Sequence, residues 1–437
     1  SIGMDVHRDF CEIAVADGGR ARSAGRAATT PEDLGLFAAS LAPDDRVVLE
    51  ATGNALAIAR IIEPHVAEVV LAHAQQVRAI SHARVKTDKI DARVLADLLA
   101  ADLIPRVWVG DERTRTLRRL VSRRRGLVKR RTQVKNEVSA VLQRNLKGRP
   151  PASDPFGRKG RIWLAAQELP ADERLTVDAA LRQLDFLGEE LAAIDHLVAV
   201  EAQGDEDVRR LLTIPGVDVT TAVTLVAVIG DISRFPSSRH LVGYLGLHPR
   251  VRQSGSGPAH HGRLSKQGSA AARHVLVEAA WMAAASPGPL HAFAARIAAR
   301  RGRQVAAVAV ARKLSVLSWC LLTRGEDYAF ARPGVVRRKL RRLELAAGAP
   351  RRRSGPQPDP VWNRDNDAAE RRLAEQAERA YERLVADRTA SPARVGAGAT
   401  PGRASSWPSK GEACTSPRQS PAPKGEDDTG GPRPSRV

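Results

Sequence analysis

The sequence predicts an α/β domain followed by a mainly helical region. Within residues 1–110, short apolar runs of strand character alternate with helix signals, which is typical of a mixed α/β domain. Two long helical patterns then cover residues 111–149 and 174–203, and helical patterns resume after residue 206. We therefore divide the chain into an α/β domain at 1–110, a basic helical hairpin or coiled coil at 111–205, a mainly helical domain at 206–330, and a charged helix with a disordered tail rich in Arg, Pro and Ser at 331–437.

The first segment reads as a hairpin followed by strand and helix units. The stretches IGMDVH and CEIAVADGG predict the hairpin, and a third strand is expected near residues 21–29. A helix begins after Thr30, because Thr is a good N-cap, Pro31 suits the first helical position and acids fill the first turn. The next elements are a strand in RVVLEATG, a helix in NALAIARIIEP, a strand in AEVVLAHA and mostly helix over residues 75–103.

The second segment opens with a long amphipathic helix over residues 111–149. Its apolar side chains recur at a coiled-coil spacing, and we expect the second long helix to return antiparallel to it. The opposite face is basic and nearly free of acids, so we expect it to bind phosphates with strong salt dependence and little reading of sequence. The basic candidates on this face are Arg118, Arg119, Arg123, Arg124, Arg125, Lys129, Arg130 and Arg131.

The third segment begins with a helix, a tight turn and a second helix in LLTIPGVDVTTAVTLVAVIGD. This stretch resembles a helix-hairpin-helix, but Asp218 stands where a second glycine is usual. It is either an element that contacts a nucleic-acid backbone, weakened by the acid at Asp218, or a packing element. A loop rich in Gly, Ser and His follows over residues 252–269, and helices over 268–286 and 289–323 are expected to close the domain.

The composition indicates a polyanionic partner. The 437 residues carry 69 Lys and Arg against 49 Asp and Glu, a formal net charge of +20. Nucleic acid is the default partner of such a basic protein. Three scattered cysteines exclude a disulfide scaffold or a zinc cluster. No uninterrupted apolar run reaches the roughly 18–20 residues of a membrane span, and no signal peptide is recognised, so we expect a cytoplasmic protein without a membrane partner.

Four carboxylates of the first segment are candidates for a metal centre. Asp5 lies in the first strand, Glu50 ends another strand, and Asp88 and Asp91 share one helix face because residues three apart are neighbours. Carboxylates that converge repel each other unless a cation neutralises them, and oxygen ligands select Mg²⁺ or Mn²⁺. Two such ions about 4 Å apart would hold the attacking and leaving oxygens of a phosphodiester. From spacing alone, solvated or ion-paired charges remain an alternative.

The stretches that carry these carboxylates resemble a known family. IGMDVH, VVLEATGN and KTDKIDARVLADLL are similar to the RuvC-like DEDD domain of insertion-sequence transposases related to pilin-gene-inverting recombinases, some of which are bridge-RNA-guided recombinases. The resemblance places the family's metal-binding catalytic acids on Asp5, Glu50, Asp88 and Asp91. It implies an RNase H-like fold and DNA chemistry that depends on Mg²⁺ or Mn²⁺.

The same resemblance implies a serine nucleophile in the third segment. Residues 246–276 are similar to the family's separate transposase domain, and the match places the nucleophile on Ser254, with Ser256 and Ser265 as rivals. The neighbouring glycines let the backbone approach a phosphate closely. The side chains expected to hold that phosphate are Arg250, Arg252, Arg263 and Lys266. Without the resemblance, the stretch reads as a flexible loop that contacts a DNA backbone.

The family therefore implies a transposase that cuts and rejoins DNA. Ser254 would attack a phosphodiester to form a covalent DNA–protein intermediate at a composite site shared between protomers. A non-coding guide RNA of the element would select target and donor DNA by base pairing. The long amphipathic helices favour a homodimer or homotetramer. Two alternatives stay open: a RuvC-like junction nuclease that uses metal and water, and a non-catalytic basic scaffold that binds RNA.

Overall fold

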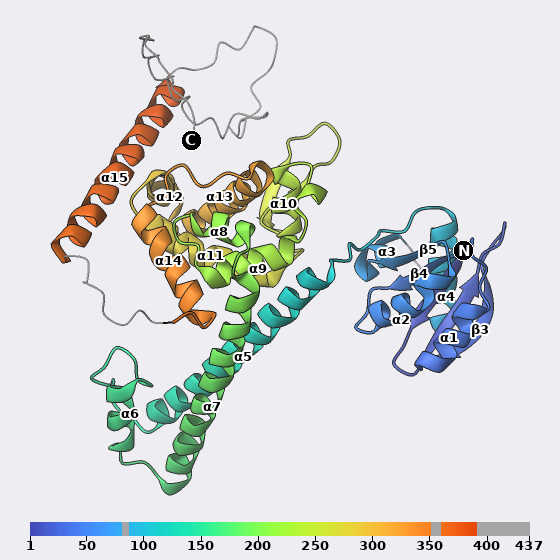
Figure 1. Cartoon of the computed structure of the whole chain (residues 1–437), viewed down its shortest axis with the longest axis horizontal. Coiled ribbons are helices and arrows are strands. Elements are labelled where there is room, and N and C mark those ends of the chain that lie inside the picture. Colours follow the sequence, from blue (N-terminus) through green and yellow to red (C-terminus); the bar gives the residue numbers. More distant parts are fainter. Residues whose placement is uncertain (81–86, 351–359, 391–437) are drawn as a thin grey trace, which may run out of the picture. The chain divides into compact units, whose positions relative to one another are not determined.

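The computed structural model describes residues 1–80, 87–350 and 360–390, and it divides the chain into two compact units (Figure 1). The first unit comprises residues 1–111 and the second comprises residues 112–437. The first is a mixed α/β unit and the second is mostly helical, as the sequence predicts. Residues 351–359 and 391–437, which include most of the expected disordered tail, lie outside the described residues.

A five-stranded mixed sheet forms the centre of the first unit, in the order β3-β2-β1-β4-β5. Strands β1, β2 and β3 are antiparallel neighbours, whereas β1, β4 and β5 run parallel. The predicted hairpin and third strand are confirmed. The bounds are β1 (Ile2–Val6), β2 (Phe10–Val15), β3 (Arg22–Ala28), β4 (Arg46–Glu50) and β5 (Glu68–Ala72).

Helices cover both faces of this sheet. On one face, Met4 and Leu49 share a buried cluster with residues of α1 (Pro31–Ala39) and α2 (Ala55–Ile62). On the other face, Val48 is buried with residues of α3 (Ala74–Ile80) and α4 (Asp88–Ala100). The predicted cap is present, since the Thr30 side chain accepts a hydrogen bond from the Asp33 backbone nitrogen. The sheet is therefore a buried middle layer between two helical layers.

The second unit opens with two long helices, α5 (Glu112–Arg144) and α7 (Ala171–Ala202), separated in the chain by α6 (Arg158–Ala165). Ion pairs join Arg113 to Asp205 and Arg144 to Glu173, so the start of one helix meets the end of the other. The two helices consequently run antiparallel. Buried Leu and Val side chains such as Leu127, Val138, Leu184 and Leu191 fill the interface between them.

Two helices in the remainder of the second unit correct the sequence expectations. The single helix expected over 289–323 is divided into α12 (Pro289–Arg301) and α13 (Arg303–Arg324). The break falls at Gly302, whose φ of +82° is a left-handed conformation that glycine adopts without a Cβ penalty. Helix α13 is also long and apolar enough to cross a membrane by length and composition, but Arg312 and Lys313 interrupt its apolar run. Of its most apolar 18-residue window, 61% is buried inside the unit.

The loop expected over 252–269 is in part a β-hairpin. Strands β6 (Pro249–Arg252) and β7 (His260–Leu264) pair antiparallel and carry the serine-rich turn between them. The other helices of this unit surround a single large core. They are α8 (Glu206–Leu212), α9 (Val219–Ile229), α10 (Ser238–Tyr244), α11 (Ala270–Ala285), α14 (Pro333–Ala346) and α15 (Pro360–Ala390).

Candidate active site

The register of the sheet brings Asp5 and Glu50 to one face of the first unit. Met4 lies opposite Leu49 in the parallel pair β1/β4, so Asp5 and Glu50 follow at the same level of the sheet. Side chains alternate between the faces of a strand, and Val48 is buried against α4, so Glu50 points to the α4 side. This is how two strand ends supply two of the four predicted acids to one place.

Gly3 lets helix α4 lie directly on strand β1. A Cβ atom at Gly3 would lie 2.2 Å from the carbonyl oxygen of Ala92, so the backbone of the helix rests on the backbone of the strand. Asp88 and Asp91 occupy the first turn of α4, immediately before this contact. Asp5 lies two residues beyond Gly3 on the same face of β1. The close approach therefore brings the first turn of α4 to the Asp5 end of the strand.

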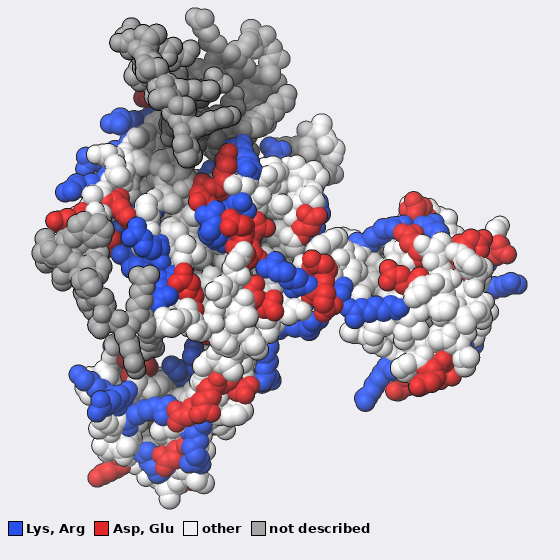
Figure 2. Space-filling view, viewed as in Figure 1, with Lys and Arg blue, Asp and Glu red and all other residues white. Residues whose placement is uncertain are grey.

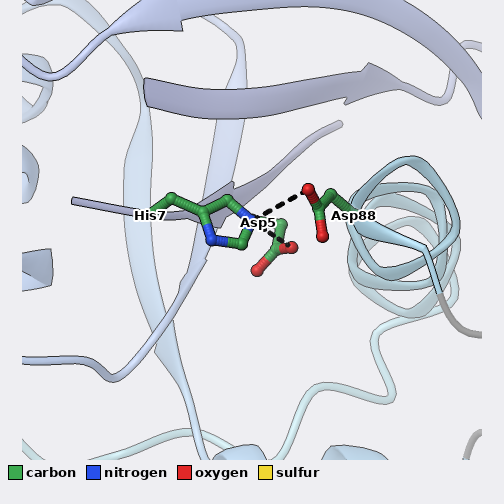
Figure 3. A group of neighbouring side chains, drawn as sticks. All are labelled: Asp5, His7 and Asp88. Atoms are coloured by element: carbon green, nitrogen blue, oxygen red, sulfur yellow. Dashed lines mark ion pairs between the residues drawn. The ribbon is translucent and has the colours of Figure 1, made fainter. Parts of the chain in front are cut away.

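Asp5, His7 and Asp88 form a compact group in the structure (Figure 3). One potential ligand atom of each residue lies within 4.8 Å of the others. The Nε2 atom of His7 is 3.2 Å from Oδ2 of Asp5 and 3.4 Å from Oδ2 of Asp88. The Asp5 side chain is 12% exposed and that of Asp88 is 44% exposed, so the group is buried at the strand and open at the helix.

The pKa of Asp5 reflects both its burial and the charged side chains around it. Burial raises the pKa of the Asp5 carboxyl above its ordinary value, and nearby His7 opposes the rise. The charges of Asp91, Asp88 and Glu50 raise it further. Coulomb effects weaken with distance, so all three of the other predicted acids act on Asp5 from close by. The structure thus groups Asp5 with Asp88 directly, whereas Glu50 and Asp91 lie outside the compact group and are linked to Asp5 through their charge.

His7 is a member of this group that the sequence does not predict. The available signal is its position two residues after Asp5, which places both side chains on one face of an extended chain. Its Nε2 atom is buried and has no hydrogen-bond partner within residues 1–80, 87–350 and 360–390, although two carboxylate oxygens lie nearby. A buried imidazole nitrogen facing two carboxylates fits a cation bound between them. The residues present therefore suit a divalent cation site.

Ser254 lies in the exposed turn of the β6–β7 hairpin. Its carbonyl oxygen accepts a hydrogen bond from the Gly257 nitrogen across 3.4 Å, and Gly255 has a left-handed φ of +55°. These features close a tight turn that leaves the Ser254 and Ser256 side chains exposed. Ser265 differs, because it is 4% exposed and its hydroxyl lies 3.5 Å from Nδ1 of His248 at the root of the hairpin.

Two family models match the chain, and they cover the two places just described. A DEDD transposase model of the IS110 type matches residues 2–146, which include all four acids. A model of the IS116/IS110/IS902 transposase family matches residues 208–295, which include the serine hairpin. The chain belongs to the IS116/IS110/IS902 transposase family. Because the family consists of transposases, the chain is an enzyme. The DEDD-type transposase family predicted from the sequence is thereby confirmed.

Individual relatives of this transposase agree with the assignment. It is 27% identical to the transposase for insertion sequence element IS1111A of Coxiella burnetii, over 56% of this chain and 68% of the relative. It is 34% identical to the putative transposase y4qE of Sinorhizobium fredii, over 45% of this chain and 48% of the relative. A pilin gene-inverting protein of Moraxella lacunata is 30% identical over 27% of this chain and 37% of its own length.

The basic face of α5 in this transposase is partly occupied by protein contacts. Arg118 donates hydrogen bonds to the carbonyl oxygens of Ala227 and Val228, the last turn of α9. Arg119, Arg123 and Arg124 form ion pairs with Glu112, Glu190 and Asp195, respectively. Arg125, Lys129 and Arg130 are exposed, and these three and the half-buried Arg131 have no ion-pair partner in the part of the chain that the structure describes. Figure 2 shows basic and acidic side chains interspersed over the second unit.

The basic residues of the serine hairpin are mostly exposed. Arg252, Arg263 and Lys266 are exposed, and Lys266 has a left-handed φ of +57°. Arg250 donates a hydrogen bond of 3.5 Å to the Ser265 carbonyl oxygen, so part of its donor capacity serves the hairpin root. Arg250 is exposed as well, so the structure places all four candidate residues where a phosphate could reach them.

The helix-hairpin-helix-like segment favours the packing alternative. A Cβ at Gly216 would lie 2.3 Å from the Ala279 carbonyl oxygen, so the turn rests directly on α11. The Asp218 carboxylate accepts a hydrogen bond from the Thr221 nitrogen and so caps α9. An acid at this position therefore has a structural reason, which the sequence comparison with a phosphate-binding turn did not reveal.

Proposed function

We propose that this transposase cuts and rejoins DNA with a divalent cation at Asp5, Glu50, Asp88 and Asp91 and with Ser254 as the nucleophile. The observation that carries the proposal is the grouping of Asp5 and Asp88 with His7, and the charges of Asp91 and Glu50, which also raise the pKa of Asp5, support the two further acids. Mg²⁺ or Mn²⁺ suits such an oxygen-rich set. The sheet order, with an antiparallel hairpin beside parallel strands, supports an RNase H-like fold for the first unit.

In the proposed site, Asp5 and Asp88 contact the cation from different sides. Asp5 is the most buried and holds the inner side of the cation site, while Asp88 lies at its open side. A bound divalent cation would draw charge from a phosphate oxygen and stabilise the charge that develops during displacement. The acids position the cation, and burial of Asp5 excludes water from one side of it.

Ser254 supplies a nucleophile that can store the energy of the broken bond. Its Oγ forms a bond to phosphorus, the bond from phosphorus to the departing sugar oxygen breaks, the hydroxyl proton is lost, and the departing oxygen takes up a proton. The serine–phosphate ester can later be attacked by another DNA hydroxyl, which releases Ser254. Arg252, Arg263 and Lys266 hold the phosphate in this step.

We also propose that a structured RNA takes part in target choice. The exposed basic residues contact phosphates, which gives affinity but little reading of sequence. Aromatic residues make up only 4% of the chain, so platforms on which bases could stack are few. A guide RNA would supply the missing specificity by base pairing. The assembly would be a homodimer or homotetramer, to be measured directly.

One assay tests this function. The full chain is incubated with Mg²⁺, DNA carrying the element ends and the flanking non-coding RNA of the element, and denaturing gels are read for a DNA–protein adduct. We expect an adduct with the native sequence and with Ser256→Ala, but none with Ser254→Ala. Asp5→Ala should abolish adduct formation while RNA and DNA binding persist.

Each other outcome assigns a different function. Cleavage without an adduct, retained in Ser254→Ala and lost in Asp5→Ala, would indicate a metal-dependent nuclease that uses water. Adducts that form equally well without RNA would remove the guide from the proposal. Nucleic-acid binding without any cleavage under all conditions would indicate a scaffold.

A further inference from the structure

The imidazole of His7 is aimed into the acid cluster by contacts outside that cluster. Its ring lies 4.9 Å from the ring of Phe10, at an interplanar angle of 35°. The guanidinium of Arg26 lies 4.4 Å from the centroid of the same Phe10 ring. The ring of His7 therefore packs against an aromatic side chain that has a second neighbour of its own.

The backbone of His7 is fixed as well. Its nitrogen donates a hydrogen bond of 2.9 Å to the Phe10 carbonyl oxygen, which closes the turn between β1 and β2. Its carbonyl oxygen accepts a hydrogen bond of 3.1 Å from the side chain of Asn54, in the loop that follows Glu50. His7 thereby connects the strand of Asp5 with the loop after Glu50, and the pre-set orientation lowers the entropy cost of binding a cation.

The fixed orientation of the His7 ring is not explained by a hydrogen bond from Nε2 to any described residue. The Nε2 atom is buried and makes no hydrogen bond to the residues that the structure describes, and the carboxylate oxygens of Asp5 and Asp88 lie next to it. The two interpretations of this arrangement are a protonated imidazole that serves as a counter-ion, and a neutral imidazole that donates its lone pair to a cation. A counter-ion would be expected to direct an N–H along a carboxylate lone pair, which the geometry lacks.

We propose that His7 is a nitrogen ligand of the cation held by Asp5 and Asp88, and that it shifts the preference of the site from Mg²⁺ toward Mn²⁺. This inference rests on the cation site of the proposed function. Imidazole suits transition-metal ions, whereas Mg²⁺ favours oxygen ligands and retains water. A site built from acids alone would lack this bias, so one histidine changes which metal the enzyme takes up.

Metal binding without DNA tests the inference. The full chain is stripped with a chelator and titrated with Mn²⁺, and free Mn²⁺ is followed by electron paramagnetic resonance; Mg²⁺ affinity is measured by competition. We expect His7→Ala to weaken Mn²⁺ binding about tenfold or more, with a smaller change for Mg²⁺. His65→Ala, which removes an exposed histidine of the same unit, should leave both affinities unchanged.

A spectroscopic measurement reads the native chain directly and uses His7→Ala only to assign the signal. Pulsed electron paramagnetic resonance of Mn²⁺ bound to the native chain should show coupling to a directly bound nitrogen, which disappears in His7→Ala. Mn²⁺ binding that is unchanged or tighter in His7→Ala identifies a counter-ion and overturns the inference, as does bound Mn²⁺ without nitrogen coupling. Binding that is also indifferent to Asp5→Ala overturns the cation site itself, so the two failures are distinguishable.

Discussion

Gly3 influences the position of two of the four acids in the proposed metal centre, although it carries no functional group. The strand and α4 are in backbone contact at this residue, and Asp88 and Asp91 lie in the turn of α4 beside it. Any side chain at Gly3 must push the helix away from the sheet. The geometry of the acids thus depends on a glycine, which has no functional side chain and is not predicted as part of the site.

We predict that Gly3→Ala destabilises the first unit by about 1–3 kcal/mol, the usual range for overpacking a well-packed core. The amides of β1 and α4 should exchange hydrogen faster, and Mn²⁺ affinity should fall because the acids no longer converge. Gly35→Ala is the matched control, since no atom of the described residues lies within 4 Å of a Cβ at this position in helix α1. Unchanged exchange and affinity in Gly3→Ala would contradict the proposed role.

Lys339 gives the second unit a predicted pH dependence. Its Nζ donates hydrogen bonds to the carbonyl oxygens of Leu212 (2.7 Å) and Ile214 (3.0 Å), which ties α14 to the end of α8. Burial lowers the pKa of Lys339 to about 8, and Asp218 opposes this effect. Between about pH 8 and the ordinary value of 10.5, the unfolded chain holds a proton that the folded protein has released. The contribution of Lys339 to stability therefore rises with pH across this window.

The test compares Lys339→Met with the native chain in urea unfolding at several pH values within the window. The variant should be less stable overall, because two buried carbonyl oxygens lose their donor. As pH rises through this window, the free energy of unfolding should increase less in the variant than in the native chain. Lys159→Met, at an exposed position, should follow the native pH profile. Parallel profiles for native chain and Lys339→Met would show that Lys339 does not titrate in this range.

The individual residues differ in how far the sequence can place them. Asp5, Glu50, Asp88 and Asp91 are predicted from the family resemblance, and the register of β1 and β4 places Asp5 and Glu50 at the same level of the sheet. The engagement of Arg118 by the end of α9 cannot be foreseen, because it depends on which helix packs against α5. A periodic pattern identifies a basic face, but only tertiary contacts decide which of its charges remain available.

Elements are predicted well where one local pattern dominates. The β1–β2 hairpin and helix α1 have clear turn and capping signals, and both lie in the expected places. The division between α12 and α13 escapes prediction because alanine-rich periodicity continues on both sides of Gly302. Glycine is tolerated inside many helices, so its use as a break depends on how the two halves pack.

The root of the serine hairpin is an element-scale feature with a testable role. Gly268 has a φ of +112°, and a Cβ there would lie 2.0 Å from the Tyr244 carbonyl oxygen, so the backbone that follows the hairpin rests on the end of α10. Arg273 of α11 donates to the carbonyl oxygens of Leu245 (3.3 Å) and Gly268 (3.0 Å). The exposed turn with Ser254 therefore projects from a fixed base.

We predict that Gly268→Ala lowers the rate of Ser254 adduct formation by about a hundredfold, because a shift of about 1 Å in a reacting group can have this effect. Gel-shift affinity for DNA should change little, since the basic side chains remain. In the control Gly243→Ala, the nearest atom to the added Cβ is 4.0 Å away, and adduct formation should be normal. Native adduct rates in Gly268→Ala would show that the root does not position the serine.

At the scale of the whole molecule, acidic side chains of α15 attach this helix to the N-terminal ends of α12 and α14. Glu378 of α15 accepts a hydrogen bond from the Gly288 nitrogen at the start of α12. Glu370 of α15 accepts one from the Gly334 nitrogen at the start of α14. Both acids satisfy the unpaired donors and the positive end of a helix dipole. Acids of α15 thus have structural partners and do not simply balance the basic charge of the chain.

The net charge of +20 therefore overstates the surface available to nucleic acid. Arg125, Lys129 and Arg130 are exposed without an ion-pair partner among the described residues, whereas Arg123 and Arg124 are paired with acids of α7. Paired arginines release few counterions when a polyanion binds, because the neighbouring acid already neutralises them. Salt dependence should consequently arise from the first group and not from the second.

We predict that replacing Arg125, Lys129 and Arg130 together by Ala lowers the slope of log affinity for duplex DNA against log salt by about 2–3, close to 0.9 for each phosphate that the variant no longer neutralises. The matched control, Arg123→Ala with Arg124→Ala, should change the slope by less than about one unit and act mainly on the α5–α7 interface. The slopes are measured by fluorescence anisotropy with unrelated duplexes, since these side chains do not read sequence. An equal decrease of slope in the control would mean that the ion pairs to α7 open on binding and that the whole face of α5 binds DNA.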